Sequence, residues 1–281
     1  MRDKRTLLDS RPGYRRAGGG IAPADFIEGM AKGIAVLESF DTHRQRLNAT
    51  QAAERAGLTR ASSRRHLLTL VHLGYLETDG HWYWLTPKVM RLSGSYLASA
   101  RLPRLVQPTL DRLSLQSGCA CSVVVCDGDD GVVVARGASL PGNYRALVHG
   151  LYLGARLPLH ATSTGKLILA SWPRAAFEHW LSASGDGDNP RSLARLTPHT
   201  LVEPRALRAD VARVRKAGHC LSSEQHEHGV HAIAVPLTDA LGRLHAALNA
   251  IAPARLHAPR DRLQQVLPML EDAASEIRPL L

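Results

Sequence analysis

Residues 57–76 read GLTRASSRRHLLTLVHLGYL, and the interpretation of the first third of the chain depends on this stretch. Leu67, Leu70 and Val71 fall on one side of a helix that turns by about 100° per residue. The opposite side and the N-terminal end carry arginines and short polar side chains, which are Arg60, Ala61, Ser62, Arg64, Arg65, His66 and Thr69. Such a helix packs by its leucines and presents a basic side to an anionic partner.

Two helices are expected before this stretch. Apolar residues at steps of four, four and three give residues 26–40 one apolar helical face. Residues 48–57 predict a second helix, which has Asn48 or Thr50 as its cap and ends at Gly57. The connection to the next helix is therefore only a few residues long, which is typical of a helix-turn-helix.

The third helix is expected to be followed by a β-hairpin. Thr59 is placed to cap the helix, and Gly74 is placed to end it. Residues 75–78 and 81–86 predict two strands, and the Asp-Gly pair between them is a strong hairpin signal. Three helices and a hairpin predict a winged helix-turn-helix DNA-binding domain over residues 25–86.

The rest of the chain predicts an α+β domain. Residues 1–24 are basic, aperiodic and expected to be disordered, and residues 87–104 are expected to form a linker and dimerisation helix that begins at Thr86-Pro87. Residues 105–281 predict a mainly antiparallel sheet flanked by helices. The expected strands are 122–127, 132–137, 145–150, 219–224, 231–239 and 243–253, and the expected helices are 103–117, 162–172, 173–182, 203–218 and 259–280.

Composition agrees with a two-domain protein that binds an anion. The chain has 281 residues, a formal net charge of +10 and a pI near 9.9, which favours nucleic acid as a partner over a merely basic surface. The four cysteines lack the second pair that a zinc site needs, so buried thiols are expected. No signal peptide and no apolar run of about 20 residues is apparent, so a cytoplasmic protein without a membrane partner is expected.

The chemistry of the basic helix side suits the major groove of DNA. Arginine bonds guanine or a phosphate, serine and threonine reach phosphates and base edges, and alanine leaves room for a thymine methyl group. We therefore expect DNA contacts from Thr59, Arg60, Ala61, Ser62, Arg64, Arg65, His66 and Thr69. The alternative is a solvated helix face, which the short turn and the hairpin make less favourable.

Several ordered motifs resemble the IclR family of transcriptional regulators. The resemblance covers nearly everything from about residue 25 to 275. The motifs that carry it are MAKGIAVLESF, AERAGLTRASSRRHLLTLVHLGYLETDG, LTPKVMRLSGSYL, LGARLPLHATSTGKLILA, EQHEHGVHAIAVPL and AALNAIAP. The form of the helix-turn-helix is similar to the branch that regulates β-ketoadipate and aromatic-acid catabolism. The resemblance implies a GAF/PAS-like effector domain, a dimer or tetramer and a near-palindromic operator.

The start of the TSTGK helix is a candidate anion site. Thr162, Ser163, Thr164 and the backbone N–H groups of Gly165 and Lys166 could hold a carboxylate there, and simple capping by Ser163 or Thr164 is compatible with that. By resemblance, Ser222, Ala232, Asn249 and Ile251 line the effector pocket. Ala232, Ile251 and Leu147 suggest a ligand less polar than pyruvate or glyoxylate, and Arg145 or His149 could add a positive contact.

The sequence lacks the complete motifs of the enzyme and metal sites that it partly resembles. TSTGK is not a P-loop, because His160 replaces the first glycine and Leu167 replaces the magnesium ligand. His226, His228 and His231 are expected to be exposed and not to bind zinc. We expect no catalytic residue, metal or cofactor. The alternatives are a small-molecule enzyme or metal-dependent sensor built on the C-terminal domain, and a DNA-binding protein that has lost its effector.

Overall fold

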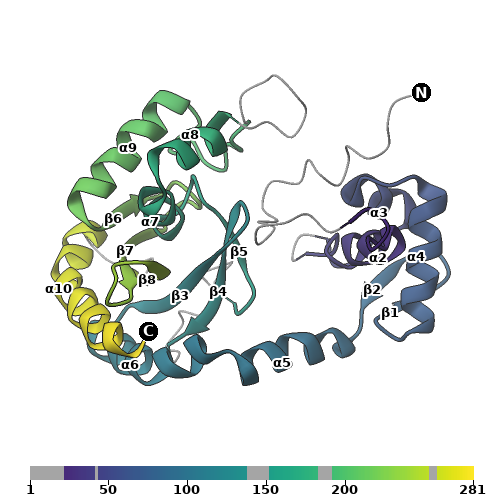
Figure 1. The fold of residues 1–281 in the computed structure, drawn as a ribbon, viewed down its shortest axis with the longest axis horizontal. Helices are drawn as coiled ribbons and strands as arrows, with labels where there is room; N and C mark the ends of the chain where they lie inside the picture. Colours follow the sequence, from purple (N-terminus) through teal and green to yellow (C-terminus); the bar gives the residue numbers. More distant parts are fainter. Residues whose placement is uncertain (1–21, 42–43, 138–151, 183–191, 253–257) are drawn as a thin grey trace. The chain divides into compact units, whose positions relative to one another are not determined.

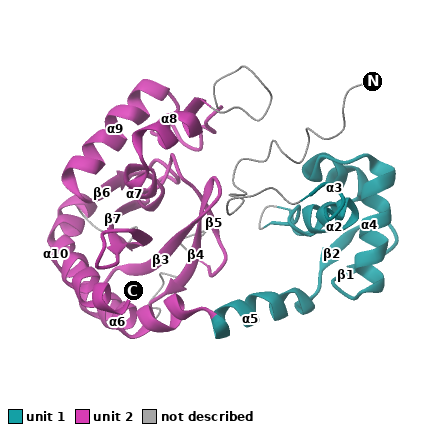
Figure 2. Cartoon of the chain, viewed as in Figure 1, with its two compact units in different colours: residues 1–7, 16–99 teal, residues 8–15, 100–281 magenta. Residues whose placement is uncertain are grey.

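The computed structural model describes residues 22–41, 44–137, 152–182, 192–252 and 258–281. These residues divide into two compact units, the first ending at Ser99 and the second beginning at Ala100 (Figure 2). The division falls inside the expected linker, residues 87–104. The expected basic tail lies outside the described residues except for its last three. None of the described helices is both long and apolar enough to cross a membrane.

The first unit contains the three expected helices, α2 (Glu28–Leu37), α3 (Ala49–Ala56) and α4 (Arg60–His72). Their core is apolar and contains Val36, Leu47, Leu67, Leu76 and Tyr83. Leu67 and Leu70 are buried and Val71 packs against them, so the apolar side of α4 is confirmed.

Helix capping explains where α3 and α4 begin. Asn48, not Thr50, caps α3 in a capping box: its side chain accepts from the backbone N–H of Gln51, and its backbone N–H donates to the Gln51 side chain. Gly57 ends α3 with φ 66°, in the left-handed region that favours glycine. Thr59 caps α4 by accepting a hydrogen bond from the backbone N–H of Ser62. The short turn expected between the two helices is confirmed.

The wing pairs β1 (Leu76–Thr78) with β2 (Tyr83–Leu85) in antiparallel register. The second strand was expected from residue 81 and begins two residues later. The carboxylate of Asp79 accepts hydrogen bonds from the N–H groups of His81 (3.0 Å) and Trp82 (2.7 Å), which removes both from the ladder. Leu47 adds a bridge to Tyr83 on the other side of β2.

Two helices follow the wing. Thr86 caps a 3₁₀ turn, η1 (Pro87–Val89), which leads into α5 (Met90–Ser99). Ala100 adopts an extended conformation (ψ 128°), so the helix breaks there and α6 (Arg101–Ser117) starts the second unit. The expected helix at 103–117 therefore begins two residues earlier than predicted.

The second unit is built on a six-stranded antiparallel sheet in the order β5-β4-β3-β8-β7-β6. Its strands are β3 (Ala120–Asp127), β4 (Asp130–Arg136), β5 (Arg156–Pro158), β6 (Cys220–Ser223), β7 (His231–Thr238) and β8 (Leu244–Ile251). Five of these were predicted. The three-residue β5 was missed because it is too short to show a period, and the expected strand at 145–150 lies outside the described residues.

Helices cover both faces of this sheet (Figure 1). One face packs against α7 (Ser163–Ser171), α8 (Arg174–Ser182) and α9 (Pro204–Ala217). The other packs against α6 and α10 (Pro259–Ile277), which the turn η3 (Arg278–Leu280) follows. Val123 and Val124 enter opposite cores, as strand alternation requires. The predicted α+β fold is confirmed.

Candidate functional site

The outer side of α4 is basic and accessible. Arg60, Arg64 and Arg65 are exposed, as are Ala61 and Thr69. Within the described part of the chain, no carboxylate forms an ion pair with any of the three arginines. Their charges are therefore available to an external anion. The structure thus brings the predicted arginines together on one accessible surface.

Three other predicted members of this surface also make contacts within the unit. His66 lies beside Gly33 of α2 and is half-buried; burial, and then the nearby Lys32 and Arg65, lower its pKa. The hydroxyl of Thr69 donates to the carbonyl of Arg65 (2.9 Å). Ser62 is half-buried against the cap.

The wing adds a basic aromatic contact that the sequence did not reveal. The guanidinium of Arg46 lies over the ring of Trp84, 4.6 Å from its centroid. The indole N–H of Trp84 donates to Glu77 on the other strand (3.0 Å). Arg46 precedes Leu47, which bridges to Tyr83, so its place beside the wing depends on tertiary packing.

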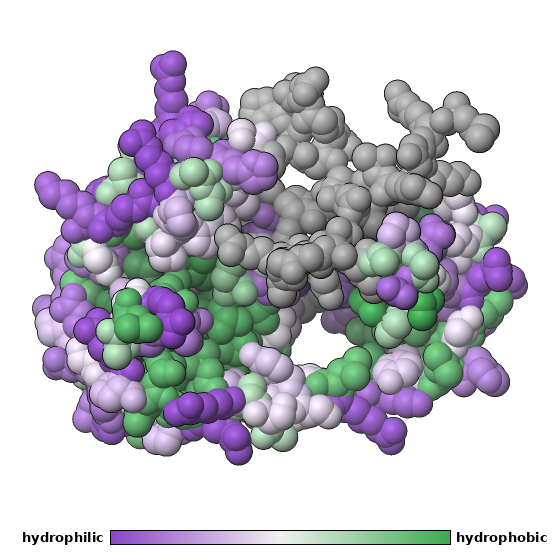
Figure 3. Space-filling view, in the orientation of Figure 1, coloured by the Kyte–Doolittle hydropathy of each residue, from purple (hydrophilic) through white to green (hydrophobic). Residues whose placement is uncertain are grey.

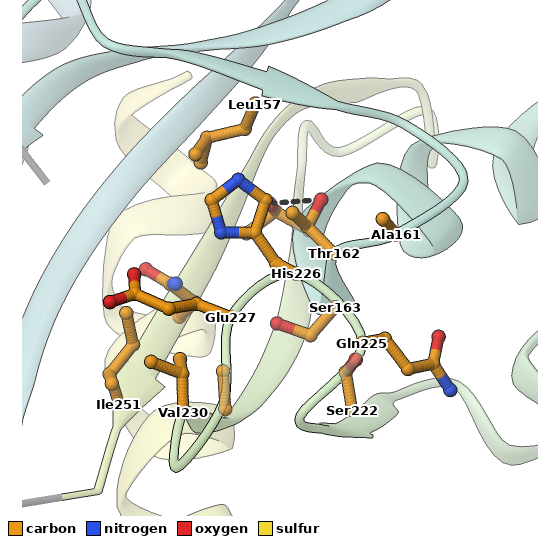
Figure 4. A pocket seen from close by; sticks show the side chains of 13 residues that line it. Leu157, Ala161, Thr162, Ser163, Ser222, Gln225, His226, Glu227, Val230 and Ile251 are labelled. Carbon is orange, nitrogen blue, oxygen red and sulfur yellow. Dashed lines mark hydrogen bonds between the residues drawn. The ribbon is translucent and has the colours of Figure 1, made fainter. Parts of the chain in front are cut away.

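A pocket opens in the second unit where the start of α7, the sheet and the segment after β6 meet (Figure 4). Six of the predicted effector contacts line it, namely Ser163, Thr164, Ser222, Ala232, Asn249 and Ile251. Thr162, which belongs to the expected anion site, also lines it. The remaining lining residues were not predicted as effector contacts, and they are Leu157, Ala161, Gln225, His226, Glu227 and Val230.

The sheet forms one side of this pocket. Ser222 pairs with Ala232, which pairs with Ile251, so the three residues form a row across β6, β7 and β8. Asn249 stands two residues from Ile251 on the same face. The hydroxyl of Ser122 donates to the side-chain carbonyl of Asn249 (2.5 Å), which leaves the Asn249 NH₂ group as a donor for the pocket.

The start of α7 differs from the prediction in one respect. The cap is Thr162, whose hydroxyl accepts from the N–H of Gly165 and whose carbonyl accepts from the N–H of Lys166, both at 3.0 Å. The expected open N–H groups at Gly165 and Lys166 are therefore engaged. Those of Ser163 and Thr164 have no hydrogen-bond partner among the described residues.

Two buried serines have hydroxyls that are not used elsewhere in the described part of the chain. Ser163 is 2% exposed and Ser222 is 6% exposed, and neither hydroxyl makes a hydrogen bond to a described residue. Figure 4 shows the Ser163 hydroxyl pointing into the pocket, toward the side where Glu227 and Ile251 lie. Together with the two N–H groups they offer donors to a single small anion.

Gly165, an expected effector contact, is not among the residues that line the pocket. A Cβ at this position would lie 2.3 Å from the Cα of Leu159 and 2.4 Å from its carbonyl oxygen. Glycine is needed there because the backbones approach closely. Leu147, Arg145 and His149, also suggested by the sequence, lie outside the described residues.

The segment from Glu224 to Val230 forms the wall that faces α7. Glu224 has φ 55°, and its N–H donates to the carbonyl of Val230 (2.7 Å). The hydroxyls of Thr197 and Thr200 donate to the carbonyls of Glu224 (2.6 Å) and Gln225 (2.7 Å). The wall is thus fixed by hydrogen bonds from a segment distant in sequence, which explains why its role was not apparent from residue pattern alone.

Beneath the start of α7, Lys166 is fully buried. Its ammonium group donates to Asp210 of α9 (2.8 Å) and to the side-chain oxygen of Gln225 (3.0 Å). Burial raises the pKa of Asp210, but Lys166 and Arg213 lower it by more, so it lies below its usual value. This ion pair ties α7, α9 and the pocket wall together.

Thiols and histidines form no metal centre among the described residues. Cys119, Cys121 and Cys220 are buried as expected, whereas Cys126 is exposed. His226 was predicted to be exposed, but it is half-buried in the pocket wall, and burial lowers the pKa of its imidazole. His199 lies 3.8 Å from Glu224, outside the lining of the pocket.

Comparison with known proteins places both regions in one family. Residues 30–80 match the model of the IclR helix-turn-helix domain, and residues 94–278 match that of the bacterial transcriptional regulator IclR C-terminal domain. The chain is 45% identical to the Pca operon regulatory protein of Acinetobacter baylyi, covering 93% of this chain and 91% of that protein. It is 44% identical to the p-hydroxybenzoate hydroxylase transcriptional activator of the same organism, covering 93% and 94%.

A solved structure resembles the second unit. It is a double mutant of the PobR inducer-binding domain from Acinetobacter in complex with 3-hydroxybenzoic acid. The identity is 38% and the TM-score 0.59, over 65% of this chain and all of that one.

Proposed function

The chain belongs to the IclR family of bacterial transcriptional regulators, and from that premise we propose that it binds a near-palindromic DNA operator as a homo-oligomer under the control of a small carboxylate. The observation that carries the DNA-binding half is the exposed basic side of α4, whose arginines have no internal ion-pair partner among the described residues. A protein with this task acts in the cytoplasm.

The arginines of α4 supply both kinds of DNA contact. One guanidinium can bond O6 and N7 of a guanine, and others can bond phosphates on either side of the groove. Thr59, Ser62 and Thr69 lie on the same helix and are suited to phosphates or base edges. Arg46 on Trp84 is placed on the wing, where it supports a further phosphate contact.

Pairing of two copies is supported by apolar side chains that the first unit leaves uncovered. At the start of α2, Ile27 and Met30 are 68% and 65% exposed, and Phe26 and Ile34 are exposed as well. On α5, Met90 and Leu92 are exposed, and Figure 3 shows hydrophobic surface along this helix. Burying such patches in a two-fold dimer would match the symmetry of a palindrome.

The pocket supports a carboxylate with an apolar body. Ser163, Ser222 and the N–H groups of Ser163 and Thr164 offer donors for one carboxylate, and the helix dipole favours an anion there. Leu157, Ala232 and Ile251 give the same pocket apolar walls. An aromatic acid or its ring-cleaved product fits both features, and the relatives named above act in the control of such pathways.

The effector can change operator binding only by favouring one arrangement of the paired domains. The test of the DNA-binding half is fluorescence anisotropy with duplexes from the region upstream of the chain's own gene. We expect one duplex to bind at least about 1,000-fold more tightly than a scrambled duplex. If all duplexes bind with equal affinity, and that affinity varies only with salt concentration, sequence-specific recognition would be overturned.

Two further measurements address the alternatives. Light scattering of Met30→Glu against wild type tests the dimer, because a charge in the apolar patch should shift the equilibrium toward monomer. Incubation of the full chain with the candidate acids, with product analysis and metal analysis, tests the enzyme or metal-sensor alternative. Turnover, or a stoichiometric metal needed for the response, would favour that alternative.

A further inference from the structure

The pocket has a second polar side, formed by His226 and Glu227. Both side chains line the pocket, and Figure 4 shows the Glu227 carboxylate beside Ile251, across the pocket from Ser163 and Ser222. Glu227 is half-buried, and no Lys or Arg of the described residues forms an ion pair with it. A half-buried carboxylate without a cationic partner among the described residues can accept a hydrogen bond from a ligand that enters the pocket.

The charge of the described lining limits what the pocket can hold. Glu227 is its single formally charged side chain, since the burial of His226 lowers the pKa of the imidazole and keeps it neutral at pH 7. The donors at the start of α7 are all neutral, and Lys166 behind them is already paired with Asp210. The described lining therefore offers donors for one anion at the start of α7, and a second carboxylate near Glu227 would meet its like charge.

We propose that Glu227, with His226 beside it, is the specificity residue that accepts a hydrogen bond from a hydroxyl of the effector. The effector is then a hydroxylated monocarboxylate, such as a hydroxybenzoate, and not a dicarboxylate such as β-ketoadipate. This inference rests on the proposed function, because it takes a carboxylate effector in this pocket as given.

The chemistry sets the expected selectivity. An ionised carboxylate is acceptor-only, so a phenolic O–H satisfies it, whereas a C–H, a methoxy oxygen or a second carboxylate does not. A hydrogen bond to a charged acceptor corresponds to a factor of about 10 to 100 in affinity. The same factor should separate a hydroxybenzoate from benzoate, and a dicarboxylate should bind still more weakly.

The experiment is calorimetry on the full chain with a matched set of acids. The set contains benzoate, 3- and 4-hydroxybenzoate, 4-methoxybenzoate, terephthalate and β-ketoadipate. Each is titrated into wild type, Glu227→Gln and the control Glu271→Gln, which removes an exposed carboxylate of α10 outside the pocket. Circular dichroism checks that each variant is folded.

We expect wild type and the control to bind the better hydroxybenzoate about 10- to 100-fold more tightly than benzoate or 4-methoxybenzoate. In Glu227→Gln this preference should fall about tenfold, and terephthalate should gain affinity. Wild type that prefers a dicarboxylate, or a hydroxyl preference unchanged in Glu227→Gln, would overturn the role of Glu227 while leaving the carboxylate effector intact. Binding of none of the acids would instead overturn the proposed function, and this inference with it.

Discussion

The buried pair of Lys166 and Asp210 gives a stability prediction in which the two partners are unequal. Lys166 is 0% exposed, whereas Asp210 is 15% exposed and also accepts hydrogen bonds from Arg213 at 2.6 and 3.0 Å. Asp210→Asn therefore leaves a fully buried ammonium group without a carboxylate. Lys166→Met leaves a partly exposed carboxylate that keeps Arg213. Removing one partner of a buried pair costs about 3–5 kcal/mol, and we expect Asp210→Asn to fall in that range.

Lys166→Met should cost less, about 1–2 kcal/mol, because Asp210 keeps Arg213 and the group left without its donor is the neutral side-chain oxygen of Gln225. The double variant should resemble Lys166→Met, since removing both charges leaves no buried unpaired ion. For a unit of this size, Asp210→Asn should lower Tm by roughly 10 °C. Denaturant unfolding followed by circular dichroism at pH 7 measures all three variants. Equal costs for the two single variants, or additive costs in the double variant, would refute the reasoning.

The same pair has a defined pH dependence. The pKa of Asp210 is lower in the folded protein than its ordinary value, so its contribution is complete above about pH 4 and is lost as pH falls further. The stability difference between wild type and Asp210→Asn should shrink over that acid range. If the stability difference between wild type and Asp210→Asn stays constant from pH 7 to pH 3, ionised Asp210 is not the origin of that difference.

Three other outcomes follow from the site geometry. Arg65→Ala should weaken operator binding by about 1–3 kcal/mol in anisotropy, with Arg112→Ala as the control, and unchanged affinity would remove Arg65 from the recognition surface. Ser163→Leu should fill the space at the start of α7 where the carboxylate binds, and so abolish the effector response while operator binding persists. A normal response would place the carboxylate elsewhere. Of the four thiols only Cys126 is exposed, and burial raises the pKa of Cys121 and Cys220 to about 11. A thiol reagent should therefore modify one thiol in the native protein and none in Cys126→Ser.

Local signals in the sequence were enough for the first unit. The apolar side of α4, the cap at Thr59 and the left-handed Gly57 depend on residues close to one another in the chain, so periodicity and capping rules identify them. The late start of β2 was missed because the Asp79 side chain competes with the strand for backbone donors.

The effector pocket was predicted only in part, because it joins distant segments. Ser163, Ser222 and Asn249 were reached through a family resemblance, and no spacing rule brings them together. Glu227 carries no signal of its own in the sequence, because it lies in a segment whose histidines, His226, His228 and His231, have the spacing of a metal motif. The close approach of Gly165 to Leu159 is a packing constraint that only the folded chain reveals.

The central claim is that a carboxylate held at the start of α7 controls operator binding. The most direct measurement is the anisotropy of the operator complex titrated with a hydroxybenzoate and, separately, with its methyl ester. We expect the acid to change operator affinity by about 5- to 150-fold, and the ester, which lacks the negative charge, to do so only at concentrations at least tenfold higher. An ester as effective as the acid would contradict the central claim.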